Sequence, residues 1–455
     1  MQNIKKETTH STNMNKRTKI LSGIAVAAAM SIFPMSTNAQ NGTNSPYSRY
    51  GFGTINDRAQ GFNKGMAGVA QGFRDATSVN FQNPASYSAV DSLTLLFDIG
   101  VSLQYANFKQ DNLKKNAKNS AVDYVSAQFR AWRNVGMSFG LLPLTSVGYN
   151  IENKQTLPNI DGSGEKTETT SYTGDGGLHE VYLGAGWNIF KNFSIGANAG
   201  FVWGDYTHSI QAKFSDNNVN QFRRVYSADI STYKIDFGAQ YSRLVSKKDL
   251  ITLGATYTLG HQINSDAEFI NQTTNYSGSA TTGDTVKVAN AFELPHAIAA
   301  GMAWNHNNKW KVGVDYSIEL WKNAKFPQLT SNGGENKYIS STGAFDNRQR
   351  VSLGGEYIHN SLGIKYRDHI RYRAGVSYGS AYAKANGQGG TKDLMVTVGV
   401  GLPIANIINN RSTLNLSAQW ENIKPKGLGA VTENYLRLCV GITFNEKWFQ
   451  KWKAE

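Results

Sequence analysis

The sequence contains one cysteine, Cys439, nine prolines, and no apolar run of about 18 residues that could form a membrane-spanning helix. A single cysteine excludes a disulfide framework and a thiolate metal cluster. The eight histidines do not show a metal-binding spacing such as His-x-x-x-His, and no cluster of acidic residues accompanies them. We therefore expect neither a metal site nor a cofactor. Scarce proline is compatible with many uninterrupted strands.

The formal net charge is +13, but the basic residues are scattered along the chain instead of forming one stripe. At the N-terminus, Lys16, Arg17 and Lys19 precede an apolar run over residues 20–33, and small residues follow up to Ala39. This pattern predicts a signal peptide over residues 1–39, so the mature chain is exported. Export and the scattered charge argue against nucleic acid as a partner.

About fourteen segments of roughly ten residues carry an apolar side chain at every second position. A period of two places these side chains on one face of a β-strand. In a soluble sandwich that face would pack on a second sheet, whereas in a transmembrane barrel it faces lipid. The last segment shows the pattern most clearly, with Leu436, Leu438, Val440, Ile442 and Phe444.

The connections between these segments alternate between long and short, which favours the transmembrane barrel with both chain ends in the periplasm. We expect an all-β fold: a transmembrane antiparallel β-barrel of about 14 strands over residues 91–444, in an outer membrane. Residues 445–455 would form a periplasmic tail. The expected long outer loops are 107–120, 152–177, 209–226, 264–291 and 323–346.

Residues 40–90 lack strand alternation and are too apolar for a solvated tail, which predicts an N-terminal hatch inside the barrel. The segment contains Ala67-Gly68-Val69-Ala70, then Asp75-Ala76-Thr77-Ser78-Val79, then Asn83-Pro84-Ala85. These motifs resemble the hatch of the FadL/TodX-type outer-membrane transporters of long-chain fatty acids and hydrocarbons. Weaker similarities lie at residues 293–301, 310–321 and 371–375.

The resemblance implies a fourteen-stranded barrel that takes up a hydrophobic small molecule and releases it sideways into outer-membrane lipid. It assigns the hatch motif to Asp75, Asn83, Pro84 and Ala85. For Asp75 we favour a structural role, and Asn83 and Pro84 would fix a turn. Some relatives of this architecture serve protein secretion, so the alternative is a barrel that binds an exported protein and transports no small molecule.

Strand alternation directs several charged side chains into the lumen, and three arginines among them are candidate ligands for a carboxylate headgroup: Arg350, Arg371 and Arg373. His261 or Lys234 could assist them. The alternative is that these charges pair across strands and hold the hatch. The other inward-facing charges are Asp236, Lys311, Asp315, Glu319, Glu356 and Arg437.

One motif typical of hydrolases occurs, Gly375-Val-Ser377-Tyr-Gly379. A nucleophile elbow requires a strained turn from a strand to a helix, with a histidine and an acid nearby. Here the motif lies within an alternating strand, where Ser377 is one of several small inward-facing residues. We therefore expect no enzymatic activity.

Overall fold

The computed structural model describes residues 43–446, except 158–164, 217, 276–280, 333–334, 385–386, 405–411 and 427–428. The predicted signal peptide lies outside the described residues, and so does the predicted tail from residue 447 onward. Among the described residues, no helix has the length and apolar character needed to cross a membrane.

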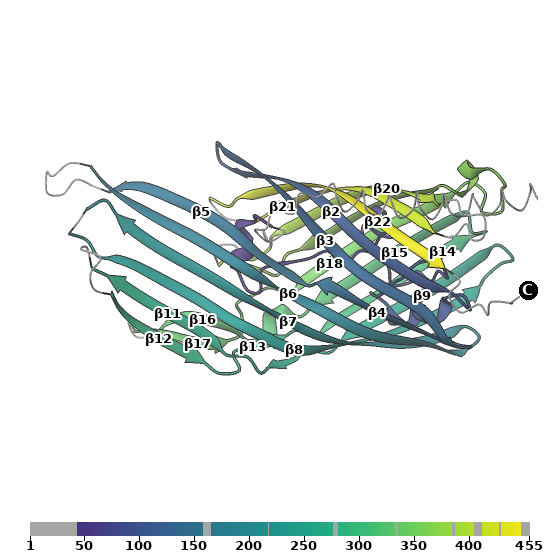
Figure 1. Ribbon diagram of the computed structural model, residues 1–455, viewed down its shortest axis with the longest axis horizontal. Helices are drawn as coiled ribbons and strands as arrows, with labels where there is room; N and C mark the ends of the chain where they lie inside the picture. Colours follow the sequence, from purple (N-terminus) through teal and green to yellow (C-terminus); the bar gives the residue numbers. More distant parts are fainter. Residues whose placement is uncertain are drawn as a thin grey trace, which may run out of the picture. The chain divides into compact units, whose positions relative to one another are not determined.

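Fourteen antiparallel strands close into a barrel, because β22 pairs with β2 along its whole length (Figure 1). This confirms the predicted fold class. The strands in barrel order are β2 (Leu95–Gln110), β3 (Leu113–Trp132), β4 (Val135–Pro143), β6 (Lys166–Phe190), β7 (Phe193–Phe214), β8 (Gln221–Leu244), β9 (Asp249–Thr258), β14 (Ala297–His306), β15 (Trp310–Glu319), β18 (Arg348–Ile358), β19 (Arg371–Ser380), β20 (Lys392–Pro403), β21 (Thr413–Lys424) and β22 (Thr432–Glu446).

The outer face of the barrel is apolar over a belt that ends in aromatic side chains on both sides. Exposed aliphatic residues such as Leu183, Leu253, Leu353 and Leu438 occupy its middle. Near the short turns the aromatic residues are Trp132, Trp187, Tyr241, Trp304, Trp310 and Tyr372, and at the other end they are Tyr105, Trp203, Tyr233, Tyr257, Tyr378 and Trp420. An apolar band with two aromatic girdles is the pattern of an integral outer-membrane barrel.

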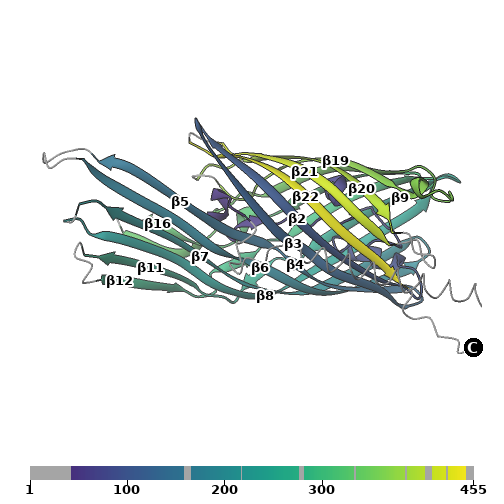
Figure 2. The same ribbon diagram turned by 45° about the horizontal axis from the view of Figure 1, so that its top comes forward.

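The expected long outer loops are wrong in one respect, because most of their residues continue the strands beyond the belt (Figures 1 and 2). Residues 107–120 form the ends of β2 and β3, which meet at Asp111 and Asn112. The alternation stops there because neither face of the extension contacts the hydrocarbon interior of the membrane, so the sequence signal disappears while the pairing continues. The other extensions include β5 (Thr145–Leu157), the hairpin β11 (Ala267–Thr274) and β12 (Thr281–Val288), and the hairpin β16 (Phe326–Asn332) and β17 (Glu335–Ser341).

Three predicted strands are interrupted in the structure. Residues 249–262 divide into β9 and β10 (His261–Ile263), and residues 292–305 into β13 (Phe292–Leu294) and β14. Residues 136–151 divide into β4 and β5 after Pro143. Pro143 and Pro295 lie next to two of these interruptions, and proline is tolerated in a sheet where pairing on one side ends, because it has no N–H to donate.

Beyond Pro143, toward the extended end of the barrel, the strands β3 and β5 follow each other around the wall, but no pairing joins them among the described residues. β3 pairs with β4 only from Val125 to Trp132, and its outer part, residues 113–124, pairs only with β2. β5 pairs with β6 and, on its other edge, only with the short strand β1 (Thr54–Ile55) among the residues that the structure describes. β3 and β5 therefore diverge toward the extended end, visibly so in Figures 1 and 2. We call this interruption the β3–β5 break.

Residues 43–94, the N-terminal segment, run through the lumen from the extended end to the end with short turns. The segment begins beside the outer end of β22, where Ser45 donates a hydrogen bond to Glu433 at 2.6 Å. Its 3-10 helices are η1 (Pro46–Arg49), η2 (Lys64–Met66) and η3 (Pro84–Ala89); the wall contributes η4 (Trp321–Asn323) and η5 (Tyr366–His369). The predicted periplasmic start of the mature chain lies outside the described residues; within them, the segment reaches the end with short turns where it enters β2.

Candidate functional site: the N-terminal segment inside the barrel

Phe52 of the N-terminal segment is inserted into a group of aromatic side chains from the extended part of the wall. Its ring centroid lies 5.3 Å from Phe326, 5.6 Å from Phe292 and 6.1 Å from Trp321. Tyr206 lies at 6.5 Å. We call these four wall residues the aromatic cage. Phe52 is 1% exposed, so the cage is filled by the protein's own side chain.

The backbone around Phe52 depends on two glycines. Gly51 has a φ of 62° and Gly53 a φ of 96°, which side-chain-bearing residues rarely adopt. A Cβ on Gly53 would also lie 2.5 Å from the carbonyl oxygen of Ser146 in β5. Tyr382 donates a hydrogen bond to the Gly53 carbonyl. These contacts hold Phe52 in the cage and lead directly into β1.

The same stretch crosses the β3–β5 break. On one side Asn44 donates a hydrogen bond to Asn119 of β3 at 2.8 Å. On the other side, Thr54 lies opposite Ser146 of β5 in the register of β1. Residues 44–55 therefore contact both strands that border the break, and the same residues carry Phe52.

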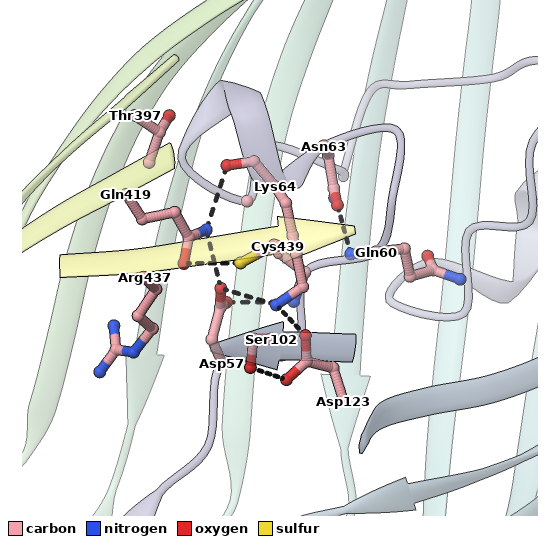
Figure 3. Close-up of polar contacts among 12 residues, drawn as sticks. Asp57, Gln60, Asn63, Lys64, Ser102, Asp123, Thr397, Gln419, Arg437 and Cys439 are labelled. Carbon is pink, nitrogen blue, oxygen red and sulfur yellow. Dashed lines mark hydrogen bonds and ion pairs between the residues drawn. The ribbon is translucent and has the colours of Figure 1, made fainter. Parts of the chain in front are cut away.

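A buried lysine connects the middle of the segment to the wall (Figure 3). Lys64 of η2 places its Nζ 3.1 Å from Asp123 of β3 and 3.9 Å from Asp57. Asp123 occupies a β-bulge, because Val122 and Tyr124 pair with consecutive residues of β2. Burial alone lowers the pKa of Lys64, but the attraction of the two carboxylates outweighs it and raises that pKa above its ordinary value.

Backbone contacts and a glutamine complete this anchor. Gln419 of β21 donates hydrogen bonds to the Lys64 carbonyl at 3.1 Å and to Asp57 at 3.4 Å. It also faces Cys439, whose sulfur lies 3.9 Å from the Gln419 Oε1. Figure 3 shows these side chains converging on η2 from β3, β21 and β22. The lone cysteine thus belongs to the contact surface for the segment.

A second anchor contains Asp75, as the sequence suggested. Asp75 accepts a hydrogen bond from Lys311 of β15 at 2.6 Å and lies 3.8 Å from Arg371 of β19. It also accepts the backbone N–H of Thr77 at 2.8 Å. Burial raises the pKa of Asp75, but Lys311 and Arg371 lower it more strongly, so its pKa lies below the ordinary range. These contacts agree with the structural role favoured from the sequence.

The Asn83-Pro84-Ala85 motif forms the start of η3. The Asn83 side chain accepts the N–H of Ala85 at 3.2 Å and donates to the Gln71 carbonyl at 2.9 Å. It therefore caps η3 and also joins two parts of the segment. The wall leaves no space at this point, because a Cβ on Gly254 of β9 would lie 1.8 Å from the Gln71 carbonyl oxygen.

The three candidate arginines already have carboxylate partners within the chain. Arg373 donates to Glu356 at 2.8 Å, and Arg371 lies 3.5 Å from the same carboxylate. Arg350 belongs to a separate group and donates to Asp393 at 2.7 Å. Arg371 and Arg373 do lie together, as their spacing predicted, but their role as ligands for a carboxylate headgroup stays a prediction.

Most of the remaining inward-facing charges also pair. Lys234 contacts Asp236 and Glu180, Glu319 accepts from Arg348, and Arg437 pairs with Glu421. Asp315 instead accepts the backbone N–H groups of Ala70 and Gln71, at 2.6 and 2.9 Å. His261 does not face this network but stacks on Tyr233 of β8, at 3.9 Å between ring centroids.

A polar cavity of about 140 Å³ remains between the N-terminal segment and the wall. Asp57 and Arg58 line it from the segment, and Asp236, Asp315 and Arg348 line it from β8, β15 and β18. A long apolar chain in such a space would displace water from the charged lining without offering hydrogen bonds in return. This cavity therefore fits water or small polar groups better than a hydrocarbon.

Sequence reasoning missed the aromatic cage, Lys64 with Asp123, and the β3–β5 break. The Gly51-Phe52-Gly53 triplet was the available signal for the aromatic cage, because two glycines around an aromatic residue indicate an unusual backbone.

Ser377, of the motif typical of hydrolases, lies in β19 and is 2% exposed, within a regular strand rather than at a turn. Within the described residues, no group of histidine, cysteine, aspartate and glutamate side chains could hold a metal ion.

The barrel is similar to solved structures of hydrocarbon channels. The toluene transporter TodX of Pseudomonas putida matches with a TM-score of 0.55 at 13% identity, over 87% of this chain and 100% of that one. TbuX, the toluene transporter of Ralstonia pickettii, gives 0.56 at 12%, over 85% and 98%. A FadL homologue of Pseudomonas aeruginosa gives 0.56 at 12%, over 87% and 99%.

At these identities the likeness shows the fold alone, which is the fold of the FadL/TodX-type transporters suggested by the sequence. No curated protein matches the chain significantly. One family model does match, over residues 18–455, which include the N-terminal segment with Phe52 and Lys64 as well as every strand of the barrel. The protein therefore belongs to the BamG family.

Proposed function

We propose that the protein takes up a hydrophobic small molecule from outside the cell and releases it sideways into the outer membrane. The aromatic cage is the capture site, and the β3–β5 break is the exit. In this proposal the N-terminal segment acts as the hatch. The observation that carries it is Phe52, which fills the cage in the way an aromatic or aliphatic ligand would. Solved proteins with this fold are described as toluene transporters and hydrocarbon channels, which supports the same class of ligand.

The location of the cage supports a coupling between capture and release. Phe52 is two residues from Thr54, and Thr54 pairs with β5 at the edge of the break. A ligand that displaces Phe52 therefore pulls on the residues that bridge β3 and β5. Burying an aromatic group of this size in place of Phe52 recovers about 1.5–3 kcal/mol, which offsets the loss of Phe52 from the cage.

The capture site is tested by measuring the binding of a fluorescent phenyl-substituted fatty acid, the probe, to the purified mature protein. Phe52→Ala empties the cage, so we expect tighter binding of the probe than in the unmodified protein. Phe62→Ala is the matched control, because Phe62 is also buried in the segment but packs against Phe73, away from the cage. Unchanged binding in both variants would contradict the proposed capture site.

The exit is tested separately with a cross-link. Thr54→Cys combined with Ser146→Cys places two thiols at paired positions of β1 and β5. In the Phe52→Ala background, where the probe need not displace Phe52, oxidation should leave binding of the probe intact and stop its transfer to lipid vesicles, and reduction should restore transfer. Transfer that continues after complete oxidation would exclude the β3–β5 break as the route.

A second candidate function is a barrel that binds a protein partner, and one observation favours it specifically. Residues 113–124 of β3 carry an edge that pairs with no other strand among the described residues. Such an edge can accept a strand from another protein. A partner that co-purifies stoichiometrically, together with reproducible absence of bound lipid in the mass spectrum of an extract, would support this function over transport.

A further inference from the structure

Five lysines lie on the outer face of a group of five neighbouring strands, just beyond the aromatic end of the belt; four of these strands carry them, and β22 carries none. The strands are β20, β21, β22, β2 and β3, which Figure 2 shows side by side. All five lysines are exposed. We call them the lysine surface: Lys109, Lys114, Lys118, Lys392 and Lys424.

The strand register places these lysines on the face that continues the apolar belt. Lys118 lies opposite Tyr105, which is 41% exposed at the edge of the belt. Lys109 and Lys424 follow Tyr105 and Trp420 by four residues, so they point to the same side. Four residues span about 13 Å along a strand, and less along the membrane normal because barrel strands are tilted. The ammonium groups therefore lie at the level of the lipid headgroups.

Two pairs of these lysines directly face each other. Lys109 is the register partner of Lys114, and Lys392 is the partner of Lys424. Like charges opposite each other on one face of a sheet repel and destabilise the pairing. Among the described outward-facing strand residues in this region, none is acidic; Asp111 lies in the turn. Because no carboxylate on this described face compensates the lysines, an anion from outside the chain would relieve their repulsion beyond what water and salt do.

The residues just beyond the belt differ on β7 and β8, whose exposed basic residues Lys213 and Arg223 lie farther from the belt. On β7 and β8, just beyond Trp203, the facing residues are Asp205 and Asp229, both exposed. A rim designed only for solubility would not separate acids and bases in this way. The lysine surface also borders the unpaired part of β3, so an anion bound there lies next to the β3–β5 break.

We propose that the lysine surface binds the phosphate groups of an outer-leaflet glycolipid. Phosphate matches the chemistry, because an ammonium group makes charge-assisted hydrogen bonds to phosphate oxygens. A lipid headgroup matches the location, because the lysines continue the lipid-facing surface and do not face the lumen. The inference is independent of the proposed transport function.

The test measures binding of diphosphoryl lipid A to the purified full-length mature protein by native mass spectrometry. Lys109→Gln/Lys114→Gln/Lys118→Gln should weaken binding about tenfold or more, because each lysine near a charged lipid surface contributes measurably. The control is Lys154→Gln/Lys213→Gln/Lys247→Gln, which removes three exposed charges elsewhere and should change nothing. Replacing the first three lysines with arginine should preserve binding.

Two further probes identify the source of the anion. Dephosphorylated lipid A should bind the unmodified protein as weakly as the triple glutamine variant binds the phosphorylated lipid, and inorganic phosphate alone should not compete at millimolar concentration. Equal binding of both lipids, or an equal loss in the control variant, would overturn the proposal. Full competition by inorganic phosphate, or an acidic protein retained only by the intact lysines, would also overturn it. Heat-modifiable migration on a gel verifies that each variant is a folded barrel.

Discussion

Replacing Lys64 with methionine should loosen the middle of the N-terminal segment without unfolding the barrel. Methionine keeps the length and the apolar stem of lysine but removes the charge, so Asp57 and Asp123 lose their shared cation. At 3.1 Å, the attraction between Lys64 and Asp123 is about 5 kcal/mol at an effective dielectric constant of about 20. The cost of removing both charges from water offsets part of this attraction. Removing one partner of such a buried ion pair destabilises the folded state by about 3–5 kcal/mol.

Hydrogen exchange of residues 57–70 measures this change directly. A loss of about 3 kcal/mol corresponds to roughly a 150-fold faster exchange of the amides that open with the segment. Asp123→Asn combined with Lys64→Met should recover part of the protection, because one unpaired carboxylate is removed. Lys247→Met, at an exposed turn, is the control and should have no effect. Unchanged exchange in the Lys64→Met variant would refute the view that this ion pair anchors the segment.

Three further predictions concern other contacts of the segment. Asn83→Ala should lower the free energy of unfolding by about 1–3 kcal/mol, measured by thermal unfolding. The substitution removes the cap of η3 and one of the hydrogen-bond donors to the Gln71 carbonyl. An unchanged free energy of unfolding would contradict this prediction. The pKa of Asp75 is lowered in the folded state, so its contribution to stability is complete above its unfolded pKa of about 3.9 and is lost as the pH falls further. The protection factors of residues 74–77, which correct for the pH dependence of intrinsic exchange, should be constant between about pH 5 and pH 8, fall below about pH 4, and lose this dependence in Asp75→Asn. Gly254→Ala should displace the segment and expose it to protease, whereas Gly355→Ala, whose nearest neighbour would be 3.2 Å away, should not, and equal cleavage of both variants would count against the close contact.

The barrel was predictable because its lipid-facing residues repeat with a period of two, as from Leu436 to Phe444. Where the strands leave the membrane, their outer face no longer has to be apolar. Residues such as Asn107 and Lys114 therefore have the sequence pattern of a loop, although they remain paired in strands. The same limitation hid the bulge at Asp123, because one inserted residue changes which side chains face inward without changing composition.

The sequence predicted which charged residues face the lumen, but it did not predict which of them form ion pairs. Alternation correctly directed Lys311, Arg371 and Arg373 inward, while the structural role of Asp75 stays a prediction that its contacts with Lys311 and Arg371 support. The partners of these groups depend on which strands are neighbours and on the path of the N-terminal segment, neither of which follows from local pattern. Phe52 shows the same limit, since the four residues of its cage lie between positions 206 and 326, more than 150 residues further along the chain.

The path of the N-terminal segment has a consequence for how the barrel is made. Residues 43–94 lie inside the wall, and the wall is completed by the seam between β2 and β22, from Leu95 opposite Glu446 to Lys109 opposite Thr432. The first strand and the last strand therefore meet around a piece of chain that precedes both. We therefore expect the N-terminal segment to be in place before β22 pairs with β2, so that closure of the barrel wraps the wall around it.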